Sequence, residues 1–227
     1  MIYDRAGSAI TEVQPGDFDW ARIFAGAGWF HWSGITPALS RSAARVSEEA
    51  CRAAKKRGLT VSFDINYRAK LWSTKAAGRA LRPLMQYVDL CVAGADEARS
   101  ILGAKGGTEE AVAADLAERF GFKTVAMTSR QGGSASTTNC GAMLFTGGRA
   151  FHSPRHEITI VDRVGSGDAF PGALIFSLKR GDAPQAAVNL AAAANALKHT
   201  IPGDFSILSH AEVEALAAGG NGGRVRR

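Results

Sequence analysis

Strand-like and helix-like segments alternate along most of this chain, and this alternation restricts the fold more than any other feature. Apolar, β-branched and aromatic residues fill short runs at 59–65, 87–92 and 124–128, and stretches of helical composition lie between them. Strands separated by helices of this length form right-handed βαβ units, whose parallel strands make a sheet covered by helices on both faces. The sequence therefore predicts an α/β chain with three layers and a mostly parallel central sheet.

The second half of the chain adds a different pattern. Turn-forming residues break up 132–160, which predicts a β-meander with corners at Gly141 and at Gly147-Gly148. We expect one domain over residues 1–218 and a disordered basic tail over 219–227. The predicted helices cover 37–57, 75–86, 96–102, 108–120, 167–179, 184–199 and 209–218.

Composition excludes several classes of protein. The net charge is +6, but the cations are scattered and no basic patch with interleaved aromatic residues accompanies them, so no nucleic-acid partner is expected. No apolar run long enough for a signal peptide or a membrane span is present, so we expect no membrane association and a cytoplasmic location. The three cysteines, Cys51, Cys91 and Cys140, lack metal-site spacing and are interpreted as reduced, buried thiols.

The run from Asp162 to Phe170 carries the clearest chemistry. A strand at 158–161 leads into a glycine-rich turn, and a helix begins near Gly167. Backbone N–H groups of Gly165, Ser166 and Gly167 would then form an anion hole at the helix N-terminus. The carboxylate of Asp168 would lie beside that hole, where it could accept a hydroxyl proton as a general base. The alternative is a tight turn followed by an aspartate that only stabilises the helix.

This run resembles the C-terminal signature of the ribokinase-like (PfkB) sugar kinases, with Asp162, the turn 165–168, Phe170 and Gly172 in the matching places. Ser166 replaces the usual alanine, and Arg163 replaces the usual threonine. The resemblance implies a ribokinase-like three-layer fold, ATP as phosphoryl donor, Mg²⁺ as cofactor, and Asp168 as the catalytic base. Phosphoryl transfer depends mainly on positioning and charge neutralisation, which suits such a turn.

Three further segments, 29–39, 63–72 and 198–204, resemble runs in the 2-keto-3-deoxygluconate kinases. The resemblance covers essentially the whole chain and implies transfer to the 6-hydroxyl of that sugar acid. It also implies that four residues bind the substrate, and an arginine fork suits a carboxylate. The alternatives are that Arg68 and Asp204 form surface ion pairs and that Tyr3 and Arg5 belong to a frayed N-terminus. The four are Tyr3, Arg5, Arg68 and Asp204.

A nucleotide in an open α/β sheet binds at the carboxyl ends of the strands. We therefore expect ATP across the loop 129–133 and against the helix at 184–199. Glu97 matches a family residue that helps to order magnesium, here through water. The predicted nucleotide-binding residues are Asn66, Ser129, Arg130, Gly132, Gly133, Asn195 and His199.

The N-terminal part of the family pattern has no counterpart in residues 1–20. In the family that part carries the first sheet strands, an early Gly-Gly-Asp motif and a β-lid over the sugar. The chain is therefore predicted to lack the first strands and the lid. A bare sheet edge invites association with a second copy, so a homo-oligomer is expected, but not a dimer formed through the lid.

Two functional alternatives stay open. One keeps the fold and changes the acceptor to ribose, fructose or a related ketose. The other is a catalytically silent fragment that only binds nucleotide or sugar. His31, which lies between two tryptophans, is interpreted as a core histidine rather than a catalytic one.

Overall fold

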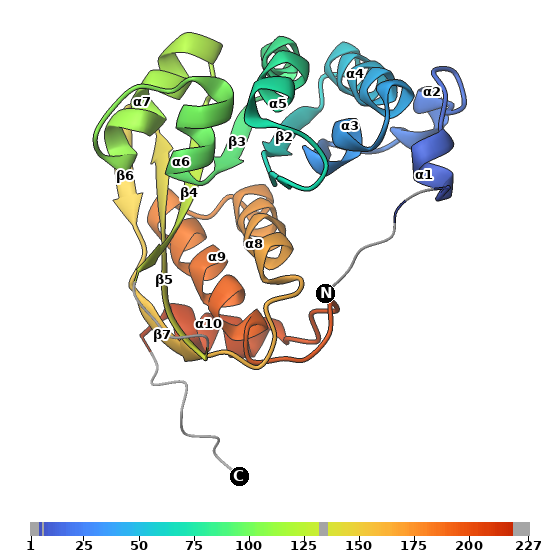
Figure 1. Ribbon diagram of the computed structural model, residues 1–227. Coiled ribbons are helices and arrows are strands. Elements are labelled where there is room, and N and C mark those ends of the chain that lie inside the picture. The colour runs from blue at the N-terminus through green and yellow to red at the C-terminus, as the bar shows by residue number, and fades with distance from the viewer. Residues whose placement is uncertain (1–4, 6, 132–135, 220–227) are drawn as a thin grey trace. The chain divides into compact units, whose positions relative to one another are not determined.

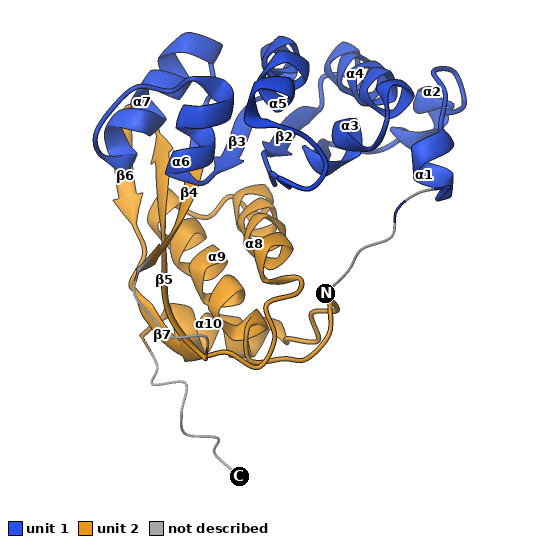
Figure 2. Cartoon of the chain, in the orientation of Figure 1, with its two compact units in different colours: residues 1–125 blue, residues 126–227 orange. Residues whose placement is uncertain are grey.

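The computed structural model describes residues 5, 7–131 and 136–219 of the chain. The chain forms two compact units, residues 1–125 and residues 126–227, which Figure 2 draws in different colours. The predicted α/β class with a mostly parallel central sheet is confirmed. The prediction of a single kinase domain over 1–218 stays a prediction.

Unit 1 is built on three parallel strands, β1 (Trp29–Ser33), β2 (Thr60–Asp64) and β3 (Leu90–Ala93). The side chain of Phe63 in β2 is fully buried, and the centroid of its ring lies 4.2 Å from that of Trp32 on β1. Helix α4 packs against both β1 and β2 (Figure 1). The helices are α1 (Ala9–Glu12), α2 (Trp20–Ile23), α3 (Ile35–Leu39), α4 (Arg41–Lys56), α5 (Thr74–Leu81), η1 (Arg82–Tyr87), α6 (Ala95–Glu97), η2 (Ala98–Leu102) and α7 (Glu109–Phe120).

The helix predicted over 37–57 is two helices, because the chain becomes extended at Ser40 (φ −160°, ψ 164°). The Ser40 hydroxyl accepts a hydrogen bond of 3.0 Å from the Ala43 N–H and so caps α4. The core interpretation of His31 is also wrong. Its side chain is exposed, and Nδ1 lies 2.8 Å from the Ser62 hydroxyl.

Asp89 joins three segments of unit 1. Its carboxylate lies 2.7 Å from Lys55 Nζ and 3.1 Å from Lys123 Nζ, and it accepts a 2.9 Å hydrogen bond from the Val61 N–H of β2. Burial alone would raise the pKa of Asp89, but the hydrogen bonds from Lys55, Val61 and Lys123 outweigh burial and lower it. The ionised carboxylate therefore stabilises the folded unit.

Replacing Asp89 by asparagine is expected to destabilise the protein by about 1–3 kcal/mol at pH 7, because charge-assisted hydrogen bonds are lost. Since the folded pKa is lowered, this stabilisation is present above the unfolded pKa of about 3.9 and is lost as pH falls through the folded value. Urea unfolding at pH 7 and at pH values below 4 measures this change. The difference between wild type and variant should shrink at low pH. Asp96→Asn, at a fully exposed carboxylate, is the matched control, and an equal effect of both variants would contradict the role of Asp89.

Unit 2 contains antiparallel strands, and β4 (Thr124–Gln131) holds the boundary between the units. Strand β5 (Thr137–Thr146) pairs antiparallel with both β6 (Arg149–His152) and β7 (His156–Thr159). The predicted antiparallel strands are therefore present, but the predicted meander is wrong, because β7 pairs with β5 and not with β6. Gly147 (φ 57°) and Gly148 (φ 74°) form the β5–β6 turn as predicted. The predicted corner at Gly141 is wrong: this glycine lies inside β5, where a Cβ would stand 3.2 Å from Cγ of Arg155.

Three helices complete unit 2: α8 (Ser166–Arg180), α9 (Pro184–Lys198) and α10 (His210–Ala217). Helix α9 contacts β5, β6 and β7, and it also packs against α8 and α10 (Figure 1). Its buried alanines allow this close approach from several sides, and Pro184 occupies its first turn, where no N–H is needed. Helix α9 is therefore the centre of the unit.

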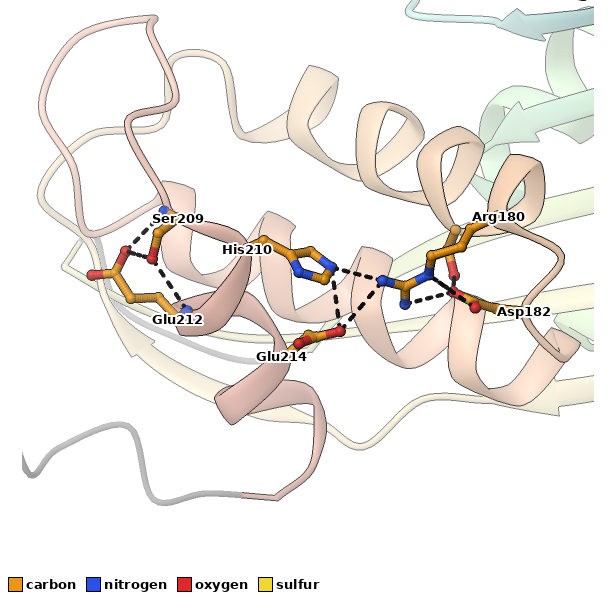
Figure 3. Close-up of polar contacts among 7 residues, drawn as sticks. Arg180, Asp182, Ser209, His210, Glu212 and Glu214 are labelled. Carbon is orange, nitrogen blue, oxygen red and sulfur yellow. Dashed lines mark hydrogen bonds and ion pairs between the residues drawn. The ribbon is translucent and has the colours of Figure 1, made fainter.

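Arg180 at the end of α8 ties that helix to α10, as Figure 3 shows. Its guanidinium lies 2.8 Å from Asp182, 3.4 Å from Glu214 and 3.0 Å from His210 Nε2. Because a guanidinium can only donate, Nε2 of His210 accepts in that last contact. Ser209 and Glu212 form a capping box that fixes the start of α10.

Two expectations about the rest of the chain are also tested. The three cysteines are free and buried, as predicted, and burial with the nearby charge of Glu48 raises the pKa of Cys51 to about 12. Among the described residues no helix is both long and apolar enough to cross a membrane.

Candidate active site

The glycine-rich turn and the start of α8 form the centre of the candidate site. Gly165 has a left-handed backbone (φ 77°) and precedes the first helical residue, Ser166. An L-residue with a side chain adopts this conformation at a cost, whereas glycine does not. The first N–H groups of a helix have no partner within it, and the helix dipole makes this end positive. The predicted anion hole at Gly165, Ser166 and Gly167 therefore has the backbone that it needs.

Asp168 lies in the first turn of α8 with its side chain exposed. No hydrogen bond or ion pair joins its carboxylate to another residue in the described part of the chain. Gly167, beside it, has open space where a Cβ would be. The carboxylate is therefore free to receive a proton from a ligand, as a general base must.

Two hydrogen bonds fix Ser166 at the base of the turn. Its hydroxyl donates to the Arg163 carbonyl at 2.9 Å, and its own carbonyl accepts from Nδ2 of Asn195 at 2.7 Å. Asn195 is buried in α9, with 6% of its surface exposed. The side-chain N–H₂ group of Asn195 thus holds the Ser166 carbonyl, and the nucleotide-binding role of Asn195 stays a prediction.

Asp162 connects the turn to the segment that follows α9. One carboxylate oxygen accepts from the Val164 N–H at 3.0 Å, and the other accepts from the Gly203 N–H at 2.8 Å. These backbone hydrogen bonds lower the pKa of the Asp162 carboxyl. Asp162 was noted in the sequence as part of the signature, but its contact with Gly203 could not be derived from the signature.

Asp204, the predicted late carboxylate, lies against the same turn. A Cβ on Gly165 would overlap the Asp204 carbonyl oxygen and stand 3.2 Å from Cε of Lys198. The Asp204 side chain is exposed, as is that of Asp168. The structure therefore brings Asp204 beside the anion hole, and its sugar-binding role stays a prediction.

The predicted nucleotide residues of unit 2 divide into two groups. Strand β4 runs to Gln131, so Ser129 and Arg130 lie in the strand and not in a loop, and Nη2 of Arg155 donates to the Ser129 hydroxyl at 3.1 Å. Gly132 and Gly133 lie outside the described residues. The prediction that the strand ends at 128 is wrong, because the polar residues 129–131 continue the extended conformation.

His199 is fully buried at the end of α9, and its Nδ1 lies 2.8 Å from the Asn195 carbonyl oxygen. Burial is the largest cause that lowers the pKa of His199; the hydrogen bond to Asn195 opposes it, and the charges of Arg130 and Arg163 lower it further. These two arginines therefore lie within electrostatic range of His199. Cations gathered at this end of the helix favour an anionic ligand.

Two predicted residues of unit 1, Asn66 and Arg68, lie just after β2. Asn66 is the one non-glycine residue with positive φ (42°) in the described part of the chain, and its Nδ2 donates to the Ser33 hydroxyl at 3.1 Å. Such strained residues cluster at functional sites. Arg68 is exposed, and its guanidinium donates to the Asn66 and Tyr67 carbonyls at 3.3 and 3.1 Å. Arg5 is half-buried, and Tyr3 lies outside the described residues.

The donor set for a metal is sparse. Glu97 is half-buried in α6, and within the ranges 7–131 and 136–219 no three histidine, cysteine or carboxylate side chains gather as a metal site would require. In nucleotide-dependent enzymes Mg²⁺ is coordinated mainly by water molecules and by the oxygens of the nucleotide phosphates. A sparse donor set of this kind fits a magnesium ion brought by a nucleotide, and the role of Glu97 through water stays a prediction.

Comparison with known proteins identifies the family of this chain. Residues 3–208 match the pfkB family of carbohydrate kinases. A 2-dehydro-3-deoxygalactonokinase of Haloferax volcanii is 37% identical over 98% of this chain and 67% of its own length. A crystal structure of 2-dehydro-3-deoxygluconokinase from Thermotoga maritima is 45% identical, with a TM-score of 0.92, over 96% of this chain and 68% of that one. A crystal structure described as a ribokinase II from E. coli, in complex with ATP and Mg²⁺, is 25% identical. Its TM-score is 0.72, over 87% of this chain and 60% of that one.

Proposed function

Because the chain belongs to the pfkB family of carbohydrate kinases, we propose that it transfers the γ-phosphoryl group of ATP to the 6-hydroxyl of 2-keto-3-deoxygluconate. The observation that carries the proposal is the left-handed Gly165 turn with the exposed carboxylate of Asp168 at the start of α8. The chain spans about two thirds of its relatives' length, so the activity of the whole protein is part of the proposal.

The turn and the carboxylate divide the chemistry between them. The N–H groups of Gly165, Ser166 and Gly167 hold the phosphoryl oxygens and stabilise the charge that they carry during transfer. Asp168 accepts the proton of the 6-hydroxyl as the oxygen bonds to phosphorus and the bond to the leaving ADP breaks. Bound with ATP, Mg²⁺ would supply further neutralisation of the phosphate charge.

The choice of a sugar acid depends on two arginines and on the relatives. Arg68 is exposed at the carboxyl end of β2, and Arg5 is the described residue of the predicted N-terminal pair. A planar guanidinium binds a carboxylate with two parallel hydrogen bonds, which a neutral ketose cannot offer. Two of the similar proteins named above are kinases of 2-keto-3-deoxy sugar acids, which supports this acceptor class.

A substrate panel with a coupled ADP-release assay tests the proposal. The acceptors are 2-keto-3-deoxygluconate, its galactonate epimer, ribose and fructose, each with ATP and Mg²⁺. We expect kcat/KM for 2-keto-3-deoxygluconate to exceed that for ribose and fructose by at least about 10³-fold, because unpaired polar groups in a site reject analogues strongly. Phosphorus NMR of the product should show a 6-phosphate.

Three outcomes would contradict parts of this proposal. Faster turnover of the galactonate epimer would reassign the acceptor within the sugar acids. Faster turnover of ribose or fructose would reassign the acceptor class. ATP binding by calorimetry without ADP release from any acceptor would favour the catalytically silent fragment.

A further inference from the structure

Lys198 is a charged residue that the site described so far does not use. It is the last residue of α9, its exposed fraction is 0%, and it lies directly beneath the glycine turn. A lysine is almost never fully buried unless its charge is compensated, since removing an ammonium ion from water is costly. The groups around its ammonium must therefore compensate the buried charge.

The ammonium group of Lys198 makes three hydrogen bonds, all to backbone carbonyls. Nζ donates to Val164 at 2.9 Å, to Ile201 at 3.1 Å and to Gly203 at 2.6 Å. An ammonium ion has three N–H groups, so each one is used. One acceptor belongs to the glycine turn, and the other two belong to the segment after α9.

Asp162 makes the complementary connection between the same two segments. Its carboxylate accepts N–H groups of Val164 and Gly203, while Lys198 donates to the carbonyls of these same residues. The negative charge of Asp162 also offsets the buried positive charge, and the charge of Lys198 contributes to the lowered pKa of Asp162. Two opposite charges thus hold Val164 and Gly203, the carboxylate through their N–H groups and the ammonium through their carbonyls.

The methylene chain of Lys198 also packs against the glycine turn. A Cβ on Gly165 would stand 3.2 Å from Cε of Lys198, so the turn packs directly on the methylene chain. On the side of Gly165 where a Cβ would stand, the Lys198 stem and the Asp204 carbonyl together fill the space. Lys198 therefore contacts the turn that carries the Gly165–Gly167 N–H groups through its stem as well as through its ammonium.

From this geometry we infer that Lys198 is a positioning residue: its buried ammonium fixes the anion-hole turn and the 201–204 segment in the arrangement needed for phosphoryl transfer. The inference rests on the proposed kinase function and adds a residue to it. Lys198 does not touch the reacting atoms. It acts through the backbone of Val164 and Gly203.

Lys198→Ala in the full chain is the test. Removing the ammonium leaves three carbonyls without a partner, and we expect kcat to fall by about 10²-fold, as misplacement of positioned groups does, with a smaller change in the KM for the sugar. Hydrogen exchange should become faster at the amides of 162–168 and 201–204 and stay unchanged in β1–β3. Lys179→Ala, at an exposed lysine of α8, loses the same charge and should match the wild type.

Chemical rescue separates positioning from general loss of structure. Propylammonium replaces the atoms that the alanine variant lacks, so it should restore part of kcat and slow the exchange of both segments again. Tetramethylammonium carries the charge without an N–H donor and should restore neither. If Lys198→Ala does not fold, restoration of folding by propylammonium, and not by tetramethylammonium, is the expected result.

Normal kcat and unchanged exchange in Lys198→Ala would overturn the inference while leaving the kinase proposal intact. Loss of structure or activity that propylammonium does not restore would also overturn it. If the wild type phosphorylates no acceptor, the kinase proposal fails by itself, and the exchange measurements still decide whether Lys198 fixes the two segments.

Discussion

Asp168→Asn is expected to lower kcat by about 10²–10⁴-fold, because asparagine cannot accept the hydroxyl proton that a general base removes. Asparagine has nearly the same shape, and the carboxylate of Asp168 has no hydrogen-bond partner among the described residues, so the fold should not change. The anion hole consists of backbone N–H groups and stays in place. ATP affinity, measured by calorimetry, should therefore stay within a few-fold of the wild type.

The matched control is Asp96→Asn, which removes one exposed carboxylate from unit 1 and should leave kcat unchanged. Full activity of Asp168→Asn would mean that another group takes the proton. A loss of ATP binding in parallel with kcat would instead make Asp168 part of the nucleotide site.

Gly165→Ala should have the second largest effect. The left-handed backbone (φ 77°) costs an alanine roughly 1–2 kcal/mol, and the new Cβ would overlap the Asp204 carbonyl oxygen. Relief of that overlap must move the turn away from the 201–204 segment. We expect kcat/KM to fall by about 10²-fold or more, as it does when one donor of an oxyanion hole is lost.

Gly181→Ala separates strain from overlap. Gly181 ends the same helix with a similar backbone (φ 86°), but no atom lies within 4 Å of the position of a Cβ. This variant should lose about 1 kcal/mol of stability and keep its activity. Thermal unfolding and steady-state kinetics of both variants provide the comparison, and equal kinetic losses would show that strain alone explains the effect.

Local signals were enough to predict the elements that carry the site. The start of α8 differs from its predicted position by one residue, and α9 begins at the predicted Pro184. A glycine-rich turn before a helix and a proline in a first turn are short-range features, so they can be read without knowledge of the fold. The class of the chain followed from the alternation of strands and helices for the same reason.

Features that depend on packing were not predicted correctly. A glycine is typical of a turn, yet Gly141 lies inside β5. The stem of Arg155, from a later segment, occupies the space beside Gly141 where a Cβ would stand. The Ser40 break was hidden by helix-forming residues on both sides, although serine is a common N-cap.

The supporting residues of the site were missed for a related reason. The acceptors of Lys198 and the second partner of Asp162 are backbone groups, and backbone groups leave no mark in a sequence. Asn195 is predicted to bind the nucleotide, and the structure adds a hydrogen bond from its side-chain N–H₂ group to the Ser166 carbonyl. In each case the residue could be noticed from the sequence, but its partner depends on how α8 and α9 pack.

The hydrogen bonds of Asp162 and Lys198 also bear on the order in which unit 2 folds. Asp162 and Gly203 are 41 residues apart, and Lys198 and Val164 are 34 apart, so neither bond can form while the intervening chain is open. Closing a loop of that length costs conformational entropy before any contact repays it. We therefore expect helices α8 and α9 to pair before the predicted anion-binding turn acquires its final shape. Catalytic competence would then be among the last properties that the newly made chain gains.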